Sequence, residues 1–206
     1  MKVLALGGSG GMGRFSSFAI SNYPNITKVT IADLNENNAK EFSNLFDDRF
    51  TGIGLDVTDT EYLEKVMSGH DIVLNTTGPF FKFGLPILKS AIKCKCHYFD
   101  ICDDWEPTEE MLKLNDEALK SEITAIVGLG ASPGISNLLG LKAMNELDKT
   151  ESIITGWDVS SAKPEDESSQ KGTNAAMEHG LQQISGEIKV YKLSLIHISE
   201  PTRPIA

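Results

Sequence analysis

The sequence lacks the features that mark membrane and nucleic-acid-binding proteins. No apolar run approaches the roughly 20 residues that span a bilayer, and the first residues lead into a predicted strand without a signal-peptide pattern. Lysine and arginine together number 19 against 29 aspartates and glutamates, which gives a formal net charge of -10. Because phosphate backbones are bound by clustered cations, this charge argues against a nucleic-acid partner. These absences indicate a cytoplasmic protein that binds neither membranes nor nucleic acid.

Cysteine is also scarce, since the chain has only Cys94, Cys96 and Cys102. An odd number of closely spaced cysteines argues against a secreted disulfide framework, so we expect reduced thiols. Together with His97 they suggest zinc, but this spacing lacks the paired ligands of structural zinc modules. We therefore predict no metal site.

The composition is that of a globular protein. Of the 206 residues, 40% are hydrophobic and 23% are charged. A single core usually takes about 100 to 150 residues, so the chain has room for one full domain and part of a second.

Short apolar runs alternate with segments of helical spacing over residues 1–127. The expected strands are 3–6, 29–32, 50–57, 72–74, 97–101 and 123–127. The expected helices are 12–20, 35–46, one capped by Thr58 or Asp59, 85–92 and 108–119. Uninterrupted apolar strands that alternate with helices predict an α/β domain, a Rossmann-type doubly wound parallel sheet.

A second domain is predicted to begin after residue 127. In the glycine-rich stretch 128–134, Ser132 is a plausible cap and Pro133 a first helical residue, for a helix that runs to about residue 147. Residues 153–160 alternate like a strand with one wet face, and 174–184 have helical spacing. We expect residues 128–191 to be the start of a mixed-sheet α+β substrate domain.

A glycine motif follows the first predicted strand and opens the first predicted helix. The sequence fits G-x-G-x-x-G, and its members are Gly8, Ser9, Gly10, Gly11, Met12 and Gly13. In this place the glycines allow a tight turn, a close backbone approach to a pyrophosphate and close helix–strand packing, while the helix supplies free N–H donors. The alternative is a tight βα turn without a ligand.

Asp33 lies twenty residues after Gly13, at the end of the second predicted strand. An acidic side chain there accepts hydrogen bonds from both ribose hydroxyls of an adenosine and repels a 2′-phosphate. No cationic residue follows before Lys40, so NAD is favoured over NADP, although a basic residue from elsewhere in the fold could compensate. The alternative role of Asp33 is that of a turn residue beside Asn35.

Other predicted strands end in residues that would line the same crevice, because ligands bind outside the carboxyl ends of parallel strands. Asp56 and Val57 are placed beside the adenine, although a lone aspartate is more often a cap. The fourth strand is followed by candidates for the nicotinamide ribose, namely Asn75, Thr76, Gly78 and Pro79. A glycine there lets a cofactor approach the backbone closely.

Four motifs together resemble the saccharopine dehydrogenase-type family of NAD(P)-dependent oxidoreductases. They are GGSGGMG at 7–13, NTTGPF at 75–80, YFDICD at 98–103 and GASPG at 130–134, and the resemblance covers residues 1–191. It implies a nucleotide domain, a mixed-sheet substrate domain, and oxidoreduction of a C–N bond in an amino-acid-like substrate.

Members of that family are longer, so we expect this chain to be a truncated fragment with little activity of its own. Residues 192–206 depart from the family pattern and resemble a translated sequencing adapter, which makes the tail look non-native. The alternative is a natural edge strand that ends at Pro201. An incomplete second domain would expose apolar strand edges, which invite pairing into a homodimer.

Asp103 is the candidate for substrate contact or proton handling, because it lies just past the fifth predicted strand. The alternative is that Asp103 or Asp104 caps the following helix. His70, His97 and His179 have no clear catalytic role. Two functions remain open: an oxidoreductase of the family's type, or a non-catalytic Rossmann module that senses the redox state of the nucleotide.

Overall fold

A computed structural model gives the fold and describes residues 1–156, 188–192 and 195–199. The chain divides into two compact units, Met1–Trp157 and Asp158–Ala206. In the second unit the described backbone forms an antiparallel pair of strands, β7 (Ile188–Lys192) and β8 (Leu195–Ser199).

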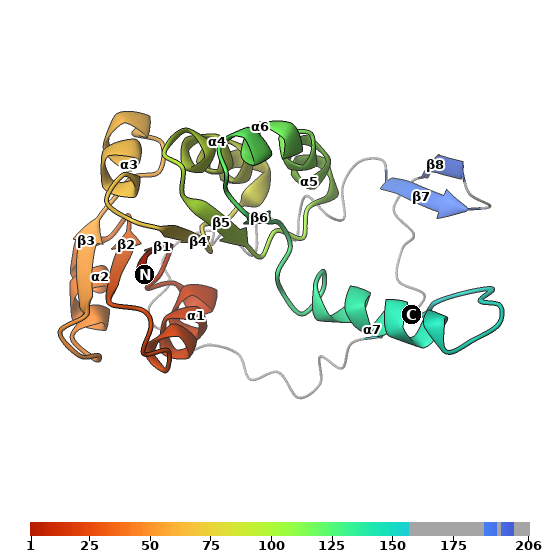
Figure 1. Cartoon of the computed structure of the whole chain (residues 1–206), viewed down its shortest axis with the longest axis horizontal. Coiled ribbons are helices and arrows are strands. Elements are labelled where there is room, and N and C mark those ends of the chain that lie inside the picture. Colours follow the sequence, from red (N-terminus) through yellow and green to blue (C-terminus); the bar gives the residue numbers. More distant parts are fainter. Residues whose placement is uncertain (157–187, 193–194, 200–206) are drawn as a thin grey trace. The chain divides into compact units, whose positions relative to one another are not determined.

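Six parallel strands form one sheet in the first unit, in the order β3-β2-β1-β4-β5-β6 (Figure 1). They are β1 (Lys2–Leu6), β2 (Lys28–Asp33), β3 (Phe50–Gly54), β4 (Ile72–Asn75), β5 (His97–Asp100) and β6 (Ala125–Ile126). The chain proceeds outward from β1 to β3 and then returns to β4 on the other side of β1. This reversal is the topological switch point at which such sheets bind ligands. The predicted doubly wound parallel sheet is confirmed.

Helices cover both faces of this sheet. The helices α1 and α2 lie on one face, and α3, α4, α5 and α6 on the other (Figure 1). Their bounds are α1 (Gly11–Ser21), α2 (Glu36–Ser43), α3 (Thr60–Met67), α4 (Phe80–Lys93), α5 (Trp105–Leu112) and α6 (Asn115–Lys120), and α7 (Ile135–Asn145) follows the sheet.

The two covered faces explain why the strands are apolar throughout. Successive residues of β1 point to opposite sides, so Val3 packs in a cluster with Phe42 of α2 while Leu4 packs in a cluster with Leu88 of α4. Val3 and Leu4 are 2% and 0% exposed. Burial on both faces fixes β1 at the centre of the sheet, so that its carboxyl end lies at the switch point.

Two helix predictions need correction on the side of α4. The helix expected over 85–92 begins earlier, at Phe80, directly after Pro79. The helix expected over 108–119 is two helices, and the first begins at Trp105. The Leu114 N–H bonds to the Met111 carbonyl oxygen, three residues back at 3.1 Å, which is a tightened turn that ends α5.

The third and sixth strands are shorter than predicted. The expected strand 50–57 ends at Gly54, although the Leu55 N–H still bonds to the Asp33 carbonyl oxygen at 2.8 Å. Asp56 then forms a turn, because its Oδ1 accepts the Thr58 N–H at 2.9 Å. The expected strand 123–127 is reduced to two residues at the edge of the sheet.

The glycine-rich stretch after β6 does not open a helix where predicted. The N-cap of α7 is Gly134, and neither Ser132 nor Pro133 has the expected cap or first helical position. Gly134 has a φ of +121°, and a Cβ there would lie 2.1 Å from the Gly130 carbonyl oxygen, so only glycine suits this turn. The side chain of Asn137 supplies the cap, with its Oδ1 accepting the Gly134 N–H at 3.0 Å.

The strand expected over 153–160 is not formed at residues 153–156. Ile154 is 91% exposed, so its side chain is not packed as it would be on the buried face of a sheet. The rest of that strand and the helix expected over 174–184 lie outside the described residues.

None of the helices in the described ranges combines the length and the apolar character needed to cross a bilayer.

Candidate cofactor site

The glycine motif forms a compact turn between β1 and α1. The Gly10 N–H bonds to the Gly7 carbonyl oxygen at 3.0 Å and closes the turn. A Cβ on Gly13 would lie 2.1 Å from that same Gly7 oxygen, well inside any allowed contact. Gly13 is therefore what lets α1 start so close to the strand, as the motif predicts.

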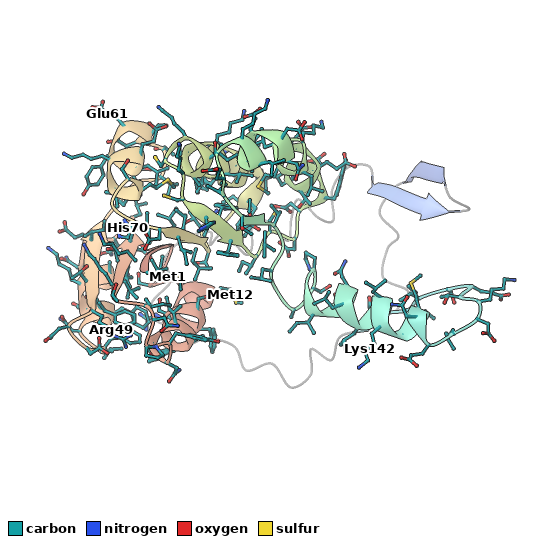
Figure 2. The ribbon with its side chains drawn as sticks, in the orientation of Figure 1. Met1, Met12, Arg49, Glu61, His70 and Lys142 are labelled. Atoms are coloured by element: carbon teal, nitrogen blue, oxygen red, sulfur yellow. The ribbon has the colours of Figure 1, made fainter. Side chains whose placement is uncertain are left out.

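The first turn of α1 presents free backbone donors. The N-cap of α1 is Gly10, which has no side chain to cap the helix, and the first helical N–H groups have no partner within a helix. Gly10, Gly11 and Met12 are exposed, and Met12, labelled in Figure 2, is 55% exposed. An anion can reach this end of the helix, where the helix dipole also favours it.

Asp33 lies at the end of β2 and is held beside the glycine turn. The Ser9 hydroxyl donates to Oδ2 of Asp33 at 2.6 Å, and the Asn35 N–H donates to Oδ1 at 3.2 Å. A carboxylate can accept about four hydrogen bonds, so two bonds leave acceptor capacity for a ligand's hydroxyls. Ser9 therefore orients the carboxylate that the sequence assigns to the ribose.

A cavity of about 200 Å³ opens at the switch point, between the carboxyl ends of β1, β2 and β4. Its lining residues lie at or just after the ends of these strands and of β3, and include Gly7, Asp33, Asp56, Val57, Thr77 and Gly78. Asp33, Asp56, Val57 and Gly78 are thus brought together as predicted from separate parts of the chain.

Thr77 gives this cavity an unsatisfied polar atom. Its Oγ1 is buried and has no hydrogen-bond partner among the described residues. A buried hydroxyl without a partner is costly, so the wall of the cavity retains an unused hydrogen-bonding group at Thr77. The donor set fits a nucleotide, since it combines free helix amides, a carboxylate for sugar hydroxyls and a threonine hydroxyl.

Asn75 and Thr76 do not line the cavity but hold the loop after β4 by hydrogen bonds. Asn75 is 0% exposed and does not line the cavity. The Thr76 hydroxyl donates to the Leu6 carbonyl oxygen at 2.8 Å and so ties the loop to the end of β1. Pro79, also predicted as a contact, is the N-cap of α4.

One carboxylate oxygen of Asp56 is engaged by hydrogen bonds within its own turn. Its Oδ1 accepts from both the hydroxyl and the N–H of Thr58, at 2.7 and 2.9 Å. These hydrogen bonds lower the pKa of the Asp56 carboxyl, with the hydroxyl contributing most. Asp56 therefore faces the cavity as a carboxylate fixed in orientation.

Tyr98 and Asp100 on β5 form a buried pair that was not predicted as a contact, although both belong to the YFDICD motif at 98–103. The Tyr98 hydroxyl donates to Oδ2 of Asp100 at 2.8 Å, and both residues are 0% exposed. Burial raises the pKa of Tyr98 well above its usual value and also raises that of Asp100. Hydrogen bonds from the N–H groups of Gly128 and Cys102 oppose the shift at Asp100.

Arg14, which precedes Asp33 in the chain, is a cation linked to that carboxylate through Ser9. Its Nε donates to the Ser9 carbonyl oxygen at 2.8 Å, and its guanidinium lies 4.7 Å from the centre of the Phe42 ring. Arg14 is thus fixed beside the residue that holds Asp33. Lys40, the first cation after Asp33, pairs instead with Glu36 at 2.6 Å on α2.

A second cavity, of about 600 Å³, lies beside the start of α5 and α7. Its lining includes Asp103, Trp105, Ser132, Ser136 and Asn137. Of the two aspartates in the capping alternative, Asp104 occupies the N-cap position of α5. Asp103 therefore has a surface on which a substrate could contact it.

The described histidines lie elsewhere. His70, labelled in Figure 2, places Nε2 2.8 Å from the Thr30 hydroxyl and Nδ1 2.8 Å from the Val66 carbonyl oxygen. The His97 Nδ1 accepts the Thr124 N–H at 2.9 Å. Both rings support the fold, and His179 lies outside the described residues.

Comparison with known proteins gives a match over most of the first unit. The family described as "Saccharopine dehydrogenase NADP binding domain" matches residues 3–126. Saccharopine dehydrogenase [NADP(+), L-glutamate-forming] of Saccharomyces cerevisiae is 31% identical over 97 residues, which are 47% of this chain and 21% of that protein. The enzyme of the same name from Pyricularia oryzae is 30% identical over 120 residues, 58% of this chain and 25% of its own length.

A solved structure agrees. The apo form of the L-glutamate-forming saccharopine dehydrogenase of Saccharomyces cerevisiae has a TM-score of 0.61 and 28% sequence identity, and the similarity covers 70% of this chain and 31% of that one. The chain therefore spans only about a fifth to a third of the length of these relatives.

Proposed function

Since the chain belongs to the family of saccharopine dehydrogenase NADP-binding domains, we propose that residues 1–127 bind NAD or NADP for the oxidoreduction of a C–N bond in an amino-acid-like substrate. The observation that carries the proposal is the cavity at the switch point, which Asp33 and Thr77 both line beside the glycine turn.

Each part of the site has a counterpart in a dinucleotide. The first helical amides at the exposed residues Gly11 and Met12 suit the pyrophosphate. Asp33 suits the adenosine ribose, because its free acceptor sites match two hydroxyl donors. Asp56 and Val57 flank the remaining wall of the cavity, where the adenine would lie.

Within this proposal NAD is the favoured cofactor, although the curated relatives are named for NADP. A carboxylate at Asp33 repels a 2′-phosphate. Arg14 is the nearby cation that could offset this repulsion, but its Nε is already engaged with Ser9. We therefore expect both dinucleotides to bind, with NAD binding more tightly.

The chemistry requires the chain to place a substrate and to handle one proton. The cofactor supplies hydride transfer when it is bound. Asp103 lines the larger cavity and would orient a substrate amine or exchange its proton. We assign the domain that starts at residue 128 to substrate binding, and the L-glutamate-forming activity of the relatives suggests an amino-acid-like substrate.

The proposed cellular location and oligomeric state rest on the net charge and on exposed apolar side chains. The net charge of -10 suits a small-molecule enzyme of the cytoplasm with no nucleic-acid partner. Leu138 and Leu139 on α7 are 68% and 61% exposed, which supports pairing into a homodimer.

Titration with NADH and NADPH tests the proposal. Asp33→Ala is expected to weaken NADH binding by about tenfold, the loss of a charge-assisted bond, and to shift the preference toward NADPH. Asp48→Ala is the matched control, because it removes one exposed carboxylate away from the cavity. Absence of dinucleotide binding to the wild-type chain contradicts the proposal, and equal NADH affinity in Asp33→Ala contradicts the ribose assignment.

The alternative, a redox-sensing module without turnover, shares this binding site. The two functions separate in a turnover assay with a panel of amino acids and keto acids, run on a protein that extends over the full length of the relatives. Cofactor consumption favours the enzyme, whereas tight binding with no consumption favours the sensor.

A further inference from the structure

A buried line of hydrogen bonds joins the loop after β4 to the segment after β6. The Thr77 N–H donates to Asn75 Oδ1 at 3.0 Å, and Asn75 Nδ2 donates to the Tyr98 hydroxyl at 3.0 Å. That hydroxyl donates onward to Oδ2 of Asp100, whose Oδ1 accepts the Gly128 N–H at 2.8 Å. The line therefore spans three strands at the carboxyl edge of the sheet.

The chemistry of these groups fixes the direction of every bond. All the partners of Asp100 are donors, since Oδ1 also accepts the Cys102 N–H at 3.0 Å. The Tyr98 hydroxyl must then donate to Asp100 and accept from Asn75, which leaves Asn75 Oδ1 to face the Thr77 N–H. Because Asn75, Tyr98 and Asp100 are all 0% exposed, bulk solvent does not reach these groups and a lost bond is costly.

The two ends of the line reach the two cavities. Thr77 lines the smaller cavity with Asp33, whereas Cys102 immediately precedes Asp103, which lines the larger one. Tyr98 and Asp100 line neither cavity. Any effect of the pair on a ligand must therefore act through the loops that it holds.

We propose that Tyr98 and Asp100 are positioning residues. They fix the loop at 75–79, beside the cofactor cavity, relative to the loop at 101–104, which contains Asp103. The pair acts on the first loop through Asn75 and on the second through the N–H of Cys102. The inference rests on the proposed function for its ligand. Without the Tyr98 hydroxyl, Asn75 loses its acceptor and Thr77 loses its fixed orientation toward the cavity. Dinucleotide affinity then falls, although no group that touches the dinucleotide has been removed.

The test compares NADH affinity in Tyr98→Phe and Tyr62→Phe. Each variant removes one phenolic hydroxyl, but Tyr62 is 39% exposed on α3 and lies outside the line. We expect NADH to bind about tenfold more weakly to folded Tyr98→Phe and unchanged to Tyr62→Phe. If the wild-type chain binds NADH and Tyr98→Phe binds it equally well, the inference is wrong and the proposed function stands.

A second variant separates positioning from loss of stability. Asn75→Leu interrupts the same line at its next member with a side chain of similar volume. We expect it to weaken NADH binding by a similar factor, and the double variant to bind no more weakly than either single variant. Additive losses would show that the two residues act independently and would overturn the proposal.

If both variants fail to fold, amide hydrogen exchange in the unmodified chain tests whether NADH binding affects the hydrogen bonds of Asp100. NADH should slow exchange of the Gly128 amide, which bonds to Asp100, while the Ser121 amide, which bonds to the Glu117 carbonyl oxygen, stays unchanged. Equal responses at the two amides contradict the proposal.

Discussion

The Ser9 hydroxyl and Asp33 Oδ2 are joined by a hydrogen bond of 2.6 Å between the glycine turn and the end of β2. A residue that fits the phosphate motif thus orients the carboxylate assigned to the sugar. The two halves of the proposed nucleotide site are coupled before any ligand arrives.

Ser9→Ala should therefore weaken NADH binding without removing a direct contact to the ribose. The expected loss is about threefold to tenfold, because one net hydrogen bond that orients a charged group disappears. Ser16→Ala on α1 is the control, since the Ser16 hydroxyl bonds only to the Met12 carbonyl oxygen at 3.2 Å. Isothermal titration of both variants measures the difference, and equal affinities would contradict the coupling.

Arg14 should govern how well the site tolerates a 2′-phosphate. We expect Arg14→Ala to weaken NADPH binding by about tenfold and NADH binding much less, because only NADPH carries the extra anion. Lys40→Ala serves as the comparison, since Lys40 is already paired with Glu36. The ratio of the two dissociation constants is the measurement, and a ratio that does not change in Arg14→Ala would remove Arg14 from this role.

Gly13→Ala should destabilise the fold strongly. Its Cβ would lie 2.1 Å from the Gly7 carbonyl oxygen, and backbone cannot yield as a flexible side chain does, so the expected cost is at least about 2 kcal/mol. Gly69→Ala is the matched control, because the Cβ there meets only the Val66 carbonyl oxygen at 3.5 Å. Urea unfolding of both variants provides the comparison. Similar midpoints would mean that α1 does not approach the turn as closely as described.

The stability of the chain should depend on His70 below about pH 6.5. Burial of the ring lowers the pKa of His70, and nearby Lys28 and Lys2 lower it further, while the Val66 carbonyl oxygen and Asp71 oppose the shift. Because the folded state disfavours the charged ring, His70 stabilises the fold above the unfolded pKa and loses this contribution as the pH falls through the interval between the two pKa values. Urea midpoints from pH 7.5 to 5 should fall less steeply in His70→Gln than in the wild-type chain, and parallel profiles would exclude the ring as a cause.

The sequence was sufficient to predict the sheet and much of the cavity. Uninterrupted apolar strands are needed wherever a sheet is covered on both faces, so Val3 and Leu4 already indicate a central parallel strand. Spacing placed Asp33 at a strand end, and strand ends converge at the switch point whatever the loops between them do.

Features that depend on partners from distant strands were not predictable. Asn75 ends β4, where a cofactor contact is expected, but its side chain bonds to Tyr98, twenty-three residues later. Arg14 precedes Asp33 in the chain and approaches it only through the turn at Ser9. The cap of α7 is Gly134 and not the predicted Ser132, because the turn requires a positive φ. A search for typical capping residues does not detect this requirement.

Backbone amide chemical shifts during a titration with NADH test the central claim most directly. If the dinucleotide binds at the switch point, the amides of Gly11, Gly13, Asn35 and Thr77 should shift together and saturate at one dissociation constant. Shifts that leave Asn35 and Thr77 unchanged, or that fall only on residues away from the switch point, would contradict it.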